Sequence, residues 1–155
     1  TLLRGAAGLF IATGEVSREE FRAYIGRLRL RELYPGIQGI GYAARVDAPN
    51  VAGHEAVMRQ VWGPWFRLWP TIEESPRELL TGISYLEPLD ERNYAAIGYD
   101  MASEPTRRAA MLQARDDGLA RASGPVTLVQ EIHADKQTGF LIYLPLYATR
   151  EPPLS

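Results

Sequence analysis

The stretch GYDMASEPTRRAAMLQARDDG, residues 98–118, places Asp100 directly after an apolar run and two arginines a few residues later. The carboxylate of an aspartate in this position can accept hydrogen bonds from the backbone of the following turn, or it can face a cavity and accept one from a ligand N–H. Local physical chemistry favours the first role. Arg107 and Arg108 stand about 100° apart on a helix, so at most one of them can face the core. We expect the inward arginine to pair with Asp100 or Glu104, and the outward one to lie in water.

Other residues that carry chemistry do not form the arrangements that catalysis or metal binding requires. His54 and His133 have no second histidine and no carboxylate at zinc spacing. The paired carboxylates are sequence neighbours, so their side chains point in different directions and cannot flank one bond. These pairs are Glu73–Glu74, Asp90–Glu91 and Asp116–Asp117. No serine stands in a G-x-S-x-G turn, and the glycines lack a nucleotide-binding spacing. We therefore expect no catalytic residue, no bound metal and no cofactor.

Composition limits the possible partners and the cellular setting. The 155 residues include 17 Lys and Arg against 19 Asp and Glu, and the formal net charge of -2 gives no reason to expect a nucleic-acid partner. The chain has no cysteine, which removes disulfides and thiolate chemistry. No apolar run approaches the roughly 20 residues of a membrane helix. We expect a single domain taken from a longer protein, with membrane segments outside this chain.

Caps and apolar spacing predict three helices that must position these groups. Ser17 and Glu20 have the spacing of a capping box at the start of the first helix, where apolar residues then recur at helical intervals. The range 51–61 fits a second, shorter helix. For the third helix, over residues 104–117, Ser103 is the predicted N-cap, and the glycine that follows residue 117 is the predicted stop.

Four apolar or alternating runs predict strands. They cover residues 37–46, 82–89, 125–132 and 139–147. The polar connection HADKQT makes the last two a predicted hairpin, and DERN after the second strand is a predicted turn. This order of helices and strands favours an α+β fold, an antiparallel sheet with helices packed on it.

Three tryptophans follow the second predicted helix in a proline-containing stretch without a clean period, which predicts irregular structure or a weak strand. Trp62, Trp65 and Trp69 can form the roof of a ligand pocket, because each offers a large apolar surface and one polar N–H. Packing in the core or in a subunit interface is the favoured alternative.

Several motifs in the same order resemble the CHASE domain, the extracytoplasmic sensory module of receptor histidine kinases, nucleotide cyclases and diguanylate cyclases. These motifs are VSREEFRAYI, YPGIQGIGYAARV, YLEPLDERNYAAIGYDMASEPTRRAA, SGPVTLVQE and TGFLIYLPLY. The stretch GYDMASEPTRRAA is the most specific of them. The resemblance implies a PAS-like antiparallel sheet with flanking helices. Residues 1–16 are then the end of a truncated stalk helix, and residues 17–155 are the sensory domain, with a membrane-proximal part shortened or absent.

The resemblance also implies a function. A protein of this kind binds a small molecule in the periplasm or outside the cell and transmits a conformational change through paired stalk helices. The full-length receptor is then a membrane-anchored homodimer that carries a kinase or cyclase, while the sensory domain itself is not an enzyme. Plant members bind cytokinins, but the ligand does not carry over to this chain. The alternative is a dimerisation or interaction module of such a receptor that binds no ligand.

Ligand-binding residues are expected where an apolar wall and a few polar anchors can converge. On the last predicted strand, Leu141, Tyr143 and Pro145 share one face, because side chains alternate along a strand. The predicted ligand-binding residues are Asp100, Tyr85, Leu128, Tyr143 and Trp69.

Overall fold

The computed structural model describes residues 2–127, 138–139 and 141–147. Its α-helices are α1 (Leu2–Thr13), α2 (Arg18–Arg27), α3 (Leu30–Leu33), α4 (Val51–Trp62), α5 (Glu91–Ala95) and α6 (Pro105–Asp117), and two 3-10 turns are η1 (Ala48–Asn50) and η2 (Met101–Ser103). Its strands are β1 (Ile40–Asp47), β2 (Leu79–Glu87), β3 (Arg121–Ala122), β4 (Val126–Thr127), β5 (Thr138–Gly139) and β6 (Ile142–Tyr143).

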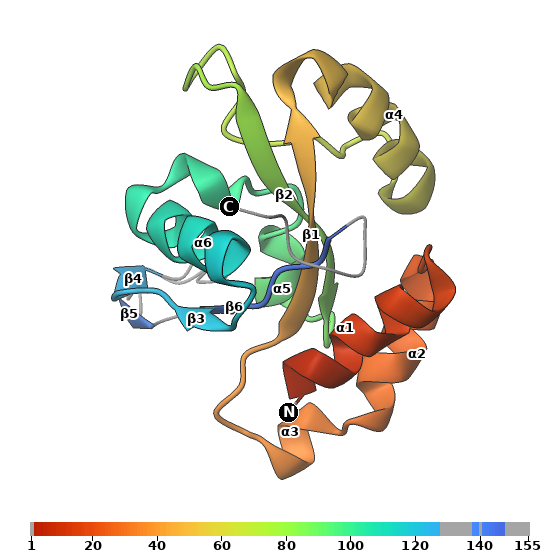
Figure 1. Cartoon of the computed structure of the whole chain (residues 1–155). Coiled ribbons are helices and arrows are strands. Elements are labelled where there is room, and N and C mark those ends of the chain that lie inside the picture. The colour runs from red at the N-terminus through yellow and green to blue at the C-terminus, as the bar shows by residue number, and fades with distance from the viewer. Residues whose placement is uncertain (1, 128–137, 140, 148–155) are drawn as a thin grey trace.

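The two long strands, β1 and β2, form an antiparallel pair through the middle of the molecule (Figure 1). In this view α1, α2 and α4 lie on one side of the pair, and α6 lies on the other side with the short strands. Those short strands also pair antiparallel, β3 with β6 and β4 with β5. The expected α+β class, with an antiparallel sheet and flanking helices, is confirmed.

A β-bulge interrupts the central pair near its middle. Tyr42 lies opposite Tyr85, but the next residue on β1, Ala43, lies opposite Ile83. Ser84 is therefore an extra residue on β2, and such a residue bends its strand and increases the local twist. Ser84 is buried, and its carbonyl accepts a hydrogen bond from the Trp62 indole N–H at 2.9 Å. Trp62, the last residue of α4, thus bonds the bulge directly.

The predicted start of the first helix is confirmed, and the predicted start of the third is wrong by one residue. At α2, the Ser17 hydroxyl accepts from the Glu20 N–H at 3.1 Å, and the Glu20 carboxylate accepts from the Ser17 N–H at 3.0 Å. At α6 the N-cap is Glu104, not Ser103. The reason is Pro105: a residue before proline is held in an extended conformation, which is the backbone geometry of an N-cap.

Other boundaries follow from local chemistry. The range predicted as the second helix is confirmed as α4, and Gly118 ends α6 in the left-handed conformation, with φ of 71°. DERN is not a plain turn, because the Asp90 carboxylate caps the one-turn helix α5. The last strand is shorter than predicted: β6 ends before Pro145, which has no N–H for a sheet. The HADKQT connection lies almost entirely outside the described residues.

Two apolar clusters flank the central strands. The larger one joins β2 to α4 and to the segments around residues 66–69 and 96–99, and includes Phe66, Leu68, Leu80, Ile83 and Ile97. The smaller one joins α1 and α2 to the start of β1, and includes Ala6, Phe21, Ile25 and Ile40. Tyr85 packs against both clusters. Most of residues 1–16, the expected end of the stalk helix, form α1, which packs on α2. The domain boundary at residue 16 stays a prediction.

The helices in the described part of the chain are all too short or too polar to cross a bilayer.

Gly98 occupies a position that excludes a side chain. Its φ is 86°, and a Cβ there would lie 2.2 Å from the carbonyl oxygen of Arg67. We expect Gly98→Ala to lower the free energy of unfolding by about 2 to 4 kcal/mol, because it adds left-handed strain and a backbone clash. The matched control is Gly53→Ala on the exposed side of α4, where nothing lies within 4 Å of the added methyl. Urea unfolding measures both, and equal effects of the two variants would contradict the assignment.

Candidate functional site

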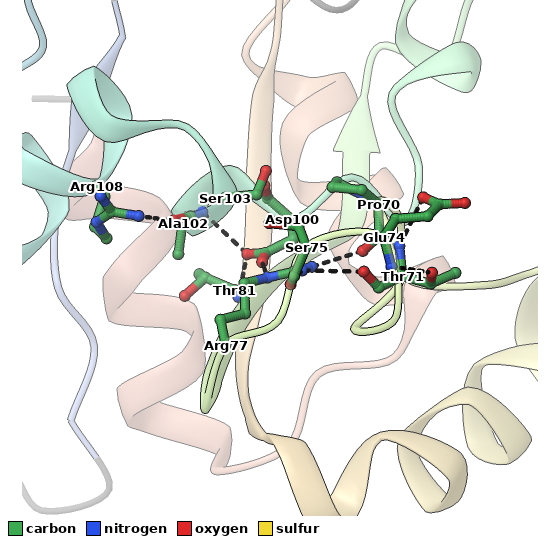
Figure 2. Close-up of polar contacts among 10 residues, drawn as sticks. All are labelled: Pro70, Thr71, Glu74, Ser75, Arg77, Thr81, Asp100, Ala102, Ser103 and Arg108. Carbon is green, nitrogen blue, oxygen red and sulfur yellow. Dashed lines mark hydrogen bonds and ion pairs between the residues drawn. The ribbon is translucent and has the colours of Figure 1, made fainter.

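Asp100 is the centre of a buried polar network, drawn in Figure 2. Its side chain is fully buried, with 0 % exposed. One carboxylate oxygen, Oδ1, accepts from the backbone N–H groups of Thr81, at 2.6 Å, and Ala102, at 2.9 Å. The other oxygen, Oδ2, accepts from Arg77 Nε at 2.5 Å. We call Asp100, Arg77, Thr81 and Ala102 the Asp100 hub.

Arg77 extends this network into the loop before β2. Its Nη1 donates to the carbonyls of Thr71, at 3.2 Å, and Ser75, and its Nη2 donates to the carbonyl of Pro70 at 2.6 Å. The side chain is 12 % exposed. A buried ion pair costs desolvation energy that is recovered only when the remaining polar atoms are also bonded. The loop carbonyls meet this requirement, so the pair fixes where the loop lies against β2.

The backbone of Asp100 is engaged as well. Its N–H donates to the carbonyl of Trp69 at 2.8 Å, and its carbonyl accepts from the Ser103 hydroxyl at 2.6 Å. The favoured prediction from sequence, in which Asp100 hydrogen-bonds the turn that follows it, is confirmed by its bonds with Ala102 and Ser103. Whether a ligand also contacts this residue stays a prediction.

Arg107 and Arg108 lie in different environments, one buried and one exposed, as expected. Arg107 is 3 % exposed and lies 3.6 Å from the Glu104 carboxylate. Arg108 is exposed and donates to the carbonyl of Ala102 at 3.1 Å. The Glu104 carboxylate also accepts from the backbone N–H of Arg107 at 2.8 Å, so Glu104 bonds the start of α6 and pairs with the inward guanidinium.

Arg107 lies in a group of aromatic residues beside the hub. Its guanidinium carbon is 5.4 Å from the centre of the Tyr99 ring, and its Nη1 lies 3.4 Å from the Tyr99 hydroxyl. The Tyr99 ring lies 4.8 Å from the Trp69 ring, and the Tyr143 hydroxyl donates to the Met101 sulfur at 3.6 Å. We call Trp69, Tyr99, Arg107 and Tyr143 the aromatic–arginine cluster.

Electrostatics fix the protonation of the groups around this cluster. Burial raises the pKa of the Tyr143 phenol well above its usual value, although the positive charge of Arg107 acts in the opposite direction. The phenol therefore stays protonated and remains a donor. Burial also raises the pKa of Glu104, but hydrogen bonds from the Thr106 and Arg107 N–H groups outweigh it, so this pKa is lowered. Glu104 is therefore a carboxylate at neutral pH.

The structure brings three of the predicted ligand-binding residues together and places a fourth elsewhere. Asp100, Trp69 and Tyr143 all lie around Tyr99. Tyr85 instead contacts Phe21, and its hydroxyl donates to the carbonyl of Val16 at 2.9 Å. Leu128 lies outside the described residues.

Sequence reasoning missed Arg77 and Tyr99. Tyr99 carried a weak signal, since it directly precedes Asp100 in the most specific motif. Arg77 carried none, because its partner Asp100 is 23 residues away.

The tryptophans use their polar atoms within the protein. The indole N–H of Trp65 donates to the carbonyl of Trp62 at 3.1 Å, and that of Trp69 donates to the carbonyl of Ile97 at 3.0 Å. Trp62 and Trp69 also pack against the larger apolar cluster, which supports the packing role for these two residues. Trp65 is 42 % exposed.

A surface cleft of about 500 Å³ lies between the end of β1 and α4. Arg45, Asp47, Asn50 and His54 contribute to its lining. Burial lowers the pKa of His54, with Glu55 acting in the opposite direction, so this histidine is neutral at neutral pH. None of the four predicted ligand-binding residues that the structure describes contributes to this lining.

Comparison with known protein families matches residues 14–155 to the model of the CHASE domain. The matched range covers nearly the whole chain and includes the hub and the aromatic–arginine cluster. A comparison with curated proteins finds no match for the chain.

Removing the charge of Asp100 is expected to destabilise the fold. Asp100→Asn keeps the shape of the side chain but leaves Arg77 buried without its counter-charge, which costs about 3 to 5 kcal/mol of unfolding free energy. The matched control is Asp47→Asn, whose side chain is 57 % exposed beside Arg45 and should change stability by less than about 1 kcal/mol. Urea unfolding followed by circular dichroism measures both. A loss below about 1 kcal/mol for Asp100→Asn would show that the ion pair does not organise the fold.

The stabilisation from Glu104 is expected to depend on pH. Because the folded pKa lies below the ordinary value of 4.5, the carboxylate stabilises the fold above pH 4.5, and this contribution is lost as pH falls through the folded pKa. Glu104→Gln should therefore cost about 0.5 to 1 kcal/mol at pH 7 and less at acidic pH. Urea unfolding of both proteins between neutral and acidic pH gives the difference. A difference that does not change with pH contradicts this assignment.

Proposed function

This chain belongs to the CHASE domain family, the extracytoplasmic sensory domains of membrane receptors, and we propose that it binds a small molecule at the aromatic–arginine cluster. As a sensory domain it performs no catalysis of its own. The full-length receptor in this proposal is anchored in the membrane, carries a histidine kinase or a cyclase, and exposes this domain in the periplasm or outside the cell.

The observation that carries the proposal is the composition of the aromatic–arginine cluster. Ligand sites combine apolar and aromatic walls with a few well-placed polar groups. Here the Trp69 and Tyr99 rings supply the wall, while the Tyr143 phenol and the Arg107 guanidinium supply donors. Arg107 belongs to α6 and Tyr143 to β6, and Figure 1 shows these two elements on the same side of the central strands.

Signalling in this proposal requires that the ligand prefer one of two conformations. A ligand shifts such an equilibrium only by the ratio of its affinities for the two states, and a hundredfold ratio supplies about 2.7 kcal/mol. The output is the position of α1, the end of the stalk helix, which pairs with its counterpart in a homodimer. A hydrophobic ligand with a few polar groups suits the walls and donors of the cluster.

An interaction module that binds no ligand is the second candidate. One observation favours it: the Trp65 and Tyr94 rings lie 5.1 Å apart and are 42 % and 46 % exposed. Exposed aromatic pairs of this kind are enriched in protein interfaces.

A thermal-shift screen against small metabolites tests the proposal. A compound present at about 100 times its Kd should raise the unfolding free energy by about 2.7 kcal/mol. Tyr143→Phe and Trp69→Phe should weaken this stabilisation at least tenfold in apparent Kd, because each alters one wall or donor of the cluster. The matched control is Tyr94→Phe, at an exposed ring away from the cluster, which should leave the Kd unchanged.

Compounds that stabilise all three variants equally would place the binding site elsewhere. Sedimentation equilibrium on the unmodified protein and on Trp65→Ser tests the second candidate. This candidate requires that the protein self-associates, that Trp65→Ser weakens the self-association, and that no compound alters it.

A further inference from the structure

Four aromatic rings connect α1 to the central strands. Phe10 of α1 stacks on Tyr42 of β1, with ring centres 4.5 Å apart, and meets Phe21 of α2 edge-on at 6.1 Å. Tyr85 of β2 completes the group, at 5.8 Å from Tyr42 and 5.6 Å from Phe21. We call Phe10, Phe21, Tyr42 and Tyr85 the aromatic clasp. Through it, α1 contacts β1 directly and is linked to β2 by way of Tyr42 and Phe21.

Tyr85 also holds the connection between α1 and α2. Its hydroxyl donates to the carbonyl of Val16 at 2.9 Å, in the connection that follows the end of α1 at Thr13. Burial raises the pKa of Tyr85, so the phenol stays protonated and continues to donate this bond at neutral pH. One β2 side chain therefore holds the connection between α1 and α2 through a hydrogen bond, and its ring is linked to Phe10 of α1 through Tyr42 and Phe21.

The same strand is bonded to the Asp100 segment a few residues earlier. The Thr81 N–H donates to the Asp100 carboxylate, and the Ile83 N–H donates to the carbonyl of Tyr99 at 3.0 Å. Between these contacts and Tyr85 stands only Ser84, the extra residue of the β-bulge. A bulge is where a strand bends most readily, because one residue has no partner in the ladder. β2 thus has one end bonded to the candidate ligand site, the other end in the aromatic clasp, and a bend between them.

We propose that β2 and the aromatic clasp are the coupling element of this domain: a change at Tyr99 alters the bend at Ser84, and Tyr85 passes that change through Tyr42 to Phe10 and α1. The role of this element in signalling rests on the proposed function. Its mechanical part concerns the protein without ligand and can be tested alone.

The input for this test is Ile83→Val, a loss of one methyl group on β2 next to the bulge. The readout is native-state hydrogen exchange of the α1 amides, corrected for the global unfolding free energy of each variant. Ile72→Val is the matched control. It removes the same methyl group from a side chain that packs against the same apolar cluster but lies outside β2. We expect α1 exchange to be roughly three- to tenfold faster in Ile83→Val than in Ile72→Val.

The clasp is tested by repeating the comparison with Tyr42 changed. Tyr42→Phe keeps the ring that stacks on Phe10, so the effect of Ile83→Val on α1 should persist. Tyr42→Leu removes the ring, and the effect should disappear. Tyr34→Leu, at a tyrosine that is 43 % exposed, is the control for loss of a tyrosine elsewhere and should leave the effect intact.

Two outcomes overturn the inference. Equal α1 exchange in Ile83→Val and Ile72→Val would show that β2 does not influence α1. An effect that survives Tyr42→Leu would show that coupling does not pass through Tyr42, the route that the inference requires. No ligand is used, so either outcome leaves the ligand-binding proposal standing, and failure of the ligand screen leaves this inference standing.

Discussion

The bond between the Arg77 guanidinium and the Asp100 carboxylate organises the rest of the structure. A fully buried carboxylate is costly unless donors surround it, and Asp100 has three: two backbone N–H groups and the guanidinium. Arg77 in turn bonds three carbonyls of the preceding loop. Both charges are therefore satisfied only when this loop, the start of β2 and η2 meet in one arrangement. The pair specifies where these segments lie, and a large net gain in stability is not required for that.

The position of the aromatic–arginine cluster follows from this arrangement. The backbone of Asp100 bonds Trp69 on one side and Ser103 on the other, which brings the Trp69 ring against Tyr99. The extended residue before Pro105 then sets where α6 begins, and one turn of helix carries Arg107 over the same tyrosine ring. The capping of α6 thus places the buried guanidinium of Arg107 against the Tyr99 ring, which the hub positions.

Features set by neighbouring residues were predictable from sequence, and those set by distant partners were not. The Ser17 capping box and the Gly118 stop depend on residues within a single turn, and both were expected. Serine is a common N-cap, which predicts Ser103 for α6, but the proline holds the residue before it in an extended conformation and so makes Glu104 the cap. The Arg77–Asp100 pair and the bulge at Ser84 arise from packing between segments. No periodicity in the sequence encodes either of them.

The hub and the aromatic clasp differ in how much they resist movement, and this difference decides which of them can carry a signal. Breaking the buried ion pair leaves a charge without its partner at a cost of about 3 to 5 kcal/mol, more than a ligand with a hundredfold preference supplies. A ring contact contributes about 0.5 to 1.5 kcal/mol beyond its buried area and tolerates offset and tilted geometries. The clasp rings already show a range of tilts, from 30° to 60°. In the proposed mechanism the Asp100 hub is therefore the fixed point of the domain, and ligand-driven movement is expected only at the bend in β2 and at the rings that hold α1.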